Sequence, residues 1–95
     1  MTLVEQTYLG LHSVGLVKSR EAFSTQYVSK NPNWYSYQTH MRRDFSVSAA
    51  VECLRALKQH EHAATLDNKQ TQSIRKITQQ LDAYLREQHL AVAYA

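Results

Sequence analysis

The sequence predicts an all-α protein of about five helices that forms a single domain, residues 1–95. The 95 residues include only two glycines and one proline, whereas a β-protein needs more turn-forming residues between its strands. Apolar residues recur instead at intervals of three and four, which is the period of an amphipathic helix. A domain of this length buries a small core and is only marginally stable alone, so a dimer would stabilise it.

The first helix is expected over residues 3–13, where several apolar side chains fall on one face. Gly15 is expected to end this helix, because glycine adopts positive φ values without steric strain. Ser19 is the expected N-cap of the second helix, and Glu21 lies in its first turn, where the helix dipole favours an acidic side chain. Pro32 cannot continue the second helix, so we expect a turn around it.

Two more helices are expected after this turn. Asn33 is the expected N-cap of a third helix, about 34–43, and Ser46 is the expected N-cap of a fourth, about 47–60. Apolar residues at helical spacing predict the side of the fourth helix that is buried. This predicted stripe consists of Val47, Ala50, Val51, Leu54 and Leu57.

The last helix is expected over about 69–91, within a C-terminal segment 67–92. Its apolar residues alternate at three- and four-residue steps, which is the pattern of a heptad seam. Such a seam can pack inside its own chain or against a second copy, and we expect self-association. The predicted dimer interface consists of Ile74, Ile77, Leu81, Tyr84 and Leu85.

Charge and cysteine content narrow the classes of function. The formal net charge is +3, so nucleic-acid affinity would have to come from clustered basic residues. The single cysteine, Cys53, cannot form a disulfide within the chain, which is typical of a reducing cytoplasm. We expect no signal peptide, because the N-terminal stretch has no basic start, and no membrane span, because no apolar run approaches about 18 residues.

The segment 34–43 is crowded with aromatic, amide and basic side chains. A helix of this length must bury one face, and Tyr37 and Met41, four residues apart, are a candidate buried pair, with Trp34 one turn earlier. The remaining side chains would form an outer face. Such a face suits contact with nucleic acid or with a protein.

Several residues between 15 and 57 carry a resemblance to a known family. The matching residues are Phe23-Ser24, Tyr27-Val28, Pro32, Trp34-Tyr35-Ser36 and Ser46. In this pattern the segment resembles the helix-turn-helix core of Cro/lambda-repressor-type (XRE-like) bacterial regulators, and it is similar to short proteobacterial proteins of this kind. The chain departs from the pattern at Ser29, where glycine is usual, and in a turn about one residue longer.

The resemblance implies a helix-turn-helix core over 15–60 whose helix 34–43 enters the major groove of double-stranded DNA. Asparagine and glutamine can pair with adenine, and arginine can pair with guanine or hold a phosphate. The implied function is a small, homodimeric, sequence-specific transcription regulator. The expected DNA-contacting residues are Lys30, Asn33, Tyr35, Ser36, Gln38, Thr39, Arg42 and Arg43.

A protein-interaction module is the alternative function. Aromatic residues and arginine are enriched at the energetic centres of protein interfaces, so the same surface could serve a compact phage- or plasmid-encoded inhibitor or adaptor. Catalysis is not expected, because no nucleophile–base motif, carboxylate pair or glycine-rich phosphate loop is present. No cofactor or metal is expected either: His60 and His62 lie two residues apart, and such residues do not face each other on a helix.

Overall fold

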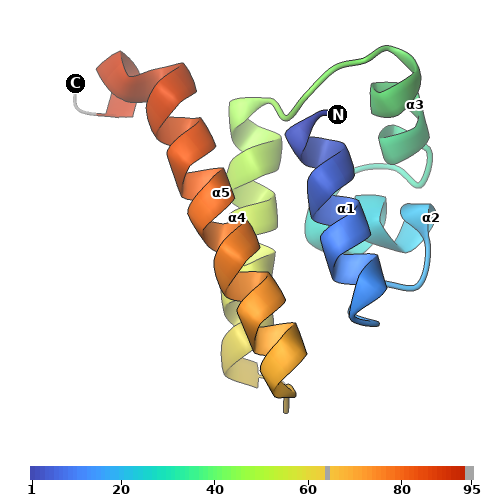
Figure 1. Ribbon diagram of the computed structural model, residues 1–95. Helices are drawn as coiled ribbons and strands as arrows, with labels where there is room; N and C mark the ends of the chain where they lie inside the picture. The colour runs from blue at the N-terminus through green and yellow to red at the C-terminus, as the bar shows by residue number, and fades with distance from the viewer. Residues whose placement is uncertain (64, 94–95) are drawn as a thin grey trace.

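The computed structural model describes residues 1–63 and 65–93, and it is all-α, as predicted. Within these residues there is no strand. Figure 1 shows α4 and α5 as a long antiparallel pair, with α1 beside them and the short α2 and α3 on the far side of α1. The elements are α1 (Leu3–Ser13), α2 (Arg20–Ala22), the π-helical segment η1 (Phe23–Tyr27), α3 (Trp34–His40), α4 (Val47–Ala63) and α5 (Asn68–Ala93).

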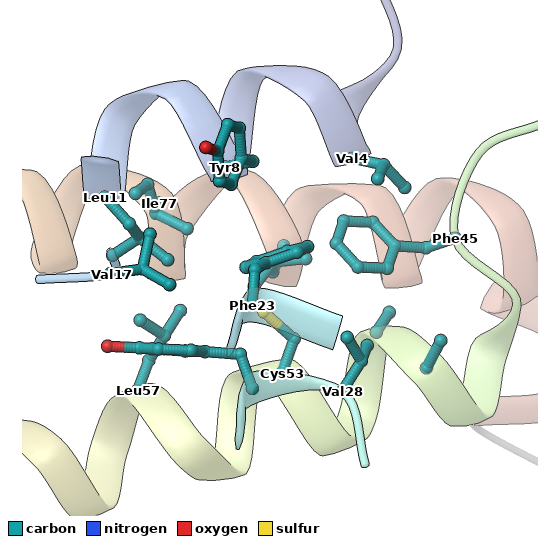
Figure 2. Packing of buried hydrophobic residues seen from close by; sticks show 14 of the residues in the cluster. Val4, Tyr8, Leu11, Val17, Phe23, Val28, Phe45, Cys53, Leu57 and Ile77 are labelled. Atoms are coloured by element: carbon teal, nitrogen blue, oxygen red, sulfur yellow. The ribbon is translucent and has the colours of Figure 1, made fainter. Parts of the chain in front are cut away.

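Phe23 is the centre of the core. Its ring is fully buried and lies within 5.8 Å of the Tyr8 ring from α1 and 5.8 Å of the Tyr35 ring from α3, measured between ring centroids. Figure 2 shows Phe23 between the side chains of α1 on one side and Cys53 and Leu57 of α4 on the other. One aromatic side chain therefore joins the short helices to the long pair.

The first helix has the predicted bounds, and Gly15 ends it as expected. Gly15 has a φ of 77°, and its amide donates to the carbonyl of His12 at 3.1 Å. The next amide, of Leu16, donates to the carbonyl of Leu11 at 3.0 Å. This pair of bonds is a Schellman motif, which satisfies the last carbonyls of the helix and needs a residue with positive φ.

The second helical segment begins at its predicted cap. The hydroxyl of Ser19 accepts a hydrogen bond from the amide of Ala22 at 3.0 Å. After three α-helical residues the segment widens into η1, and the amide of Lys30 donates to the carbonyl of Ser24 at 2.9 Å. Between them Ser29 has a φ of 56°, so it adopts the left-handed conformation that favours glycine.

The third helix is shorter than predicted and has a different start. Asn33 makes no side-chain cap bond; instead its own amide donates to the side-chain oxygen of Asn31 at 2.9 Å. The helix ends at His40 rather than Arg43, because Arg42 has a φ of 54°. The amide of Arg43 then donates back to the carbonyl of Gln38 at 2.9 Å, which closes a second Schellman motif.

The fourth helix begins at the predicted cap, since Ser46 accepts from the amide of Ala49 at 3.2 Å, but its buried face differs from the prediction. Val47 is 39% exposed, and Val51 and Leu54 are half-buried. Three of the four fully buried side chains are small, which lets α4 pack closely against both α5 and η1. The fully buried positions are Ala49, Ala50, Cys53 and Leu57.

The fifth helix covers the core of its own chain. It begins with a reciprocal cap, in which the Asp67 carboxylate accepts from the amide of Gln70 at 2.7 Å and the Gln70 side chain accepts from the amide of Asp67 at 3.1 Å. Three residues of the predicted dimer interface, Ile74, Ile77 and Leu81, are buried among helices of the same chain. The prediction that these three residues form a dimer interface is therefore wrong. They pack within their own chain, which was the alternative.

Tyr84 and Leu85 complete the predicted interface and are half-buried against the same core. The Tyr84 hydroxyl donates to the carbonyl of Phe45, which ties α5 to the segment before α4. Among the described helices, none combines the length and apolar character needed to cross a membrane.

Candidate nucleic-acid interface around α3

Tyr35 anchors α3 in the core. Its side chain is 6% exposed, and its ring lies 4.7 Å from the ring of Tyr8, between centroids. Its amide donates to the buried hydroxyl of Ser24 at 2.9 Å, which joins the first turn of α3 to η1. Burial raises the pKa of the Tyr35 phenol. The prediction that Tyr35 contacts DNA is therefore wrong, because its ring faces the core.

Tyr37 and Met41 show the opposite error. They were predicted to be buried, but they are 52% and 44% exposed. Tyr35 is buried instead, and Trp34, which was expected on the buried side, is half-buried, so α3 is rotated relative to the predicted orientation. The helical period allows either orientation of α3, and the position of Phe23 and Tyr8 beneath Tyr35 decides between them.

Two other predicted contact residues use their polar groups within the protein. The amide nitrogen of the Gln38 side chain donates to the carbonyl of Asp44 at 3.1 Å. The Thr39 hydroxyl donates to the carbonyls of Tyr35 and Ser36, at 3.1 Å each. Both side chains are half-buried, so neither is positioned to read a base edge.

The exposed side of α3 combines polar, aromatic and basic residues. The Arg43 guanidinium lies over the Tyr37 ring, 5.8 Å from its centroid, in a cation–π contact. Tyr37, His40 and Met41 were missed by the sequence prediction; the available signal was the position of His40 and Met41 three and four residues after Tyr37. We call the following set the α3 outer face: Asn33, Ser36, Tyr37, His40, Met41, Arg42 and Arg43.

The excess of basic over acidic residues falls in the segment that contains this face. No aspartate or glutamate occurs from residue 22 to residue 43, a segment that contains Lys30, Arg42 and Arg43. The other eight basic residues equal the eight acidic ones in number, so the whole formal net charge of +3 belongs to this segment. Lys30, Arg42 and Arg43 are all exposed.

Asp44 follows the two arginines but points toward α1. Its carboxylate accepts hydrogen bonds from the amides of Leu3 and Val4, each at 3.0 Å, and from its own neighbour Phe45 at 2.9 Å. Figure 1 shows the loop between α3 and α4 passing the N-terminus of α1, where this contact lies. The negative charge is thus held by the positive end of α1 rather than by the arginines.

Aromatic packing fixes the other side of the same loop. Phe45 is buried, with its ring 6.1 Å from Trp34 and 6.3 Å from Tyr84, between centroids. Burial, and then the nearby Asp44 carboxylate, raise the pKa of the Tyr84 phenol, which donates to the Phe45 carbonyl. The turn that carries Arg42 and Arg43 is therefore held against the core.

Other reactive groups of the chain lie away from this face. Cys53 is fully buried, and burial raises its pKa to about 12, so it is a neutral thiol. The described residues contain no group of three or more histidine, cysteine or acidic side chains arranged to hold a metal ion.

The comparison with known families covers all five helices. The model of a family of unknown function, DUF6626, matches residues 4–93. The chain belongs to this family. The DUF6626 match includes both the α3 outer face and the pair of long helices, so they are parts of one family domain. No curated protein and no solved structure matches the chain.

Proposed function

We propose that the protein is a small DNA-binding regulator that contacts double-stranded DNA through the α3 outer face. The observation that carries the proposal is the location of the net charge, all of which lies in residues 22–43. Two acids flank this segment: Glu21 lies in the first turn of α2, and Asp44 is held by α1. A positive surface attracts the phosphates of DNA and releases their counterions. The resemblance to XRE-like regulators agrees with this assignment.

The side chains of the α3 outer face divide by chemistry into two roles. Arg42 and Arg43, together with Lys30 before the helix, suit phosphates, which give affinity. Asn33, directly before the helix, and Ser36, on the helix, are exposed and suit base edges, which give specificity. The first amides of α3 are bonded inside the protein, that of Trp34 to Asn31 and that of Tyr35 to Ser24, so side chains must make the contacts.

The length of α3 limits what one copy can read. Seven residues extend about 10 Å along the helix axis, which is enough for only a few base pairs. A regulator with this helix would gain affinity and specificity by binding two half-sites as a homodimer. Because Ile74, Ile77 and Leu81 are buried in one chain, such a dimer would have to use another surface.

The salt dependence of DNA binding tests the proposal. Affinity for a duplex should fall steeply between 50 and 200 mM salt, and losing two phosphate contacts should reduce the slope of log K against log salt by about 2. We therefore expect Arg42→Ala combined with Arg43→Ala to flatten the slope, measured by fluorescence anisotropy. Lys58→Ala combined with Arg75→Ala, which removes two exposed charges from α4 and α5, is the control.

No binding to any duplex from a genomic fragment library at 50 mM salt would reject the DNA proposal. An equal loss of slope in the control pair would also reject it, because the charge of the α3 outer face would then have no special role.

A protein partner for the same face is the second candidate, and the exposure of Tyr37 and Met41 favours it. Aromatic residues, methionine and arginine are enriched in protein interfaces. If the face binds a protein, Tyr37→Ala should weaken the complex about tenfold or more, and salt should change its affinity little. The slope measured with DNA therefore separates the two candidates.

A further inference from the structure

A partly apolar groove lies between α1 and α5, formed by residues that the proposed DNA contact does not use. The groove has a volume of about 550 Å³. Two of the large apolar side chains most exposed in the described part of the chain belong to it, namely Met1 at 79% and Leu9 at 47%. Val14 and Ile77 also line it.

Two backbone carbonyls beside the groove are bonded within the protein. The Ser73 hydroxyl donates to the carbonyl of Gly10 at 3.2 Å, and the Gln70 side chain donates to the carbonyl of Val14 at 3.0 Å. Gly10 brings the helices together, since a Cβ atom there would lie 3.2 Å from the Cδ1 atom of Ile77. These bonds satisfy the carbonyls of Gly10 and Val14, while the side chains of Gln72 and Gln80 also line the groove.

The charged side chains that line this groove are both lysines. Lys69 and Lys76 line it from α5, seven residues and therefore about 10 Å apart along the helix. No aspartate or glutamate is among the described residues that line it. An apolar strip with lysines along one side is complementary to a helix that carries apolar residues on one face and carboxylates beside them.

We propose that the α1–α5 groove binds an acidic amphipathic helix from another protein. A second copy of this chain is a poorer occupant: in a twofold dimer the groove would face itself and bring four lysines together without a carboxylate. The site is separate from the α3 outer face, so this binding extends the proposed DNA function to a protein that could be brought to DNA. It does not depend on the DNA function.

Selection from a library tests the proposal without assuming a partner. A phage-displayed library of random 16-residue peptides is selected on the full-length protein, and enriched peptides are synthesised and titrated by fluorescence anisotropy. We expect acidic peptides with apolar residues at intervals of three and four. Leu9→Asp, and separately Lys69→Glu with Lys76→Glu, should each weaken binding by about tenfold or more.

Charge reversal elsewhere provides the control. Lys58→Glu with Arg75→Glu changes the same charge at exposed positions outside this groove and should alter the affinity less than about twofold. Three results would each overturn the proposal. The enriched peptides could lack carboxylates, the control variant could lose as much affinity as the groove variants, or no peptide could be enriched. A wild-type dimer in sedimentation that Leu9→Asp converts to a folded monomer would also overturn it, because the occupant would then be a second copy.

Discussion

At the scale of single residues, the positive φ of Arg42 is the most informative backbone feature. A non-glycine residue in the left-handed region costs on the order of 1 kcal/mol, and glycine would avoid this cost. Gly15 occupies the equivalent position at the end of α1, so the two Schellman motifs differ in this residue. Arginine at the strained position is consistent with a need for its charge on the α3 outer face.

Arg42→Gly tests whether Arg42 lowers the stability of the fold while its charge contributes to DNA binding. We expect the free energy of unfolding to rise by about 0.5–1 kcal/mol, because glycine relieves the strain, while the slope of DNA binding against salt falls. Urea denaturation followed by circular dichroism gives the stability. Arg43→Gly is the control: its φ is not positive, so glycine there should lower stability. If both variants lose stability equally, the strain at Arg42 is negligible.

At the scale of elements, the sequence predicted where helices begin and end better than which side they bury. Ser19, Ser46 and Gly15 act through hydrogen bonds to residues a few positions away, so local sequence contains the signal. The orientation of α3 depends on Phe23 and Tyr8, which no local pattern identifies. Compared with the predicted set, the observed candidate site therefore still contains the basic residues, but Tyr35 lies in the core and Tyr37 lies on the exposed face.

The contact between Asp44 and α1 couples two elements and can be tested directly. Asp44→Ala removes the acceptor of two amides in the first turn of α1, so we expect a loss of about 1–3 kcal/mol in the free energy of unfolding. Hydrogen exchange of the Leu3 and Val4 amides should accelerate. Glu52→Ala, which removes only an exposed ion pair with Arg55, should change stability by about 0.5 kcal/mol or less. Unchanged exchange in Asp44→Ala would show that this cap contributes little.

At the scale of the whole molecule, α5 acts as the wall of a single core. Ile74, Ile77 and Leu81 pack with residues from the other helices, including Phe23. A heptad pattern records only that one face is apolar, and it does not identify the surface that covers that face. For this reason the sequence could predict the helix but not whether its seam lies within or between chains.

Leu81→Asp separates these arrangements. Because Leu81 is fully buried, an unpaired carboxylate there should abolish cooperative unfolding rather than produce a folded monomer. Ala83→Asp, at an exposed position of the same helix, should remain folded. Circular dichroism with sedimentation distinguishes the outcomes, and a folded, monomeric Leu81→Asp variant would contradict the intramolecular core.

The bonds that hold α1 also bear on the order in which the chain can fold during synthesis. Eleven residues are too few for a stable isolated helix in water. The Asp44 carboxylate that caps α1 comes 40 residues after Val4 in the chain. The Ser73 hydroxyl that donates to Gly10 comes 63 residues after Gly10. A ribosome would therefore release α1 long before its partners exist, and the domain can close only once α5 has left the exit tunnel.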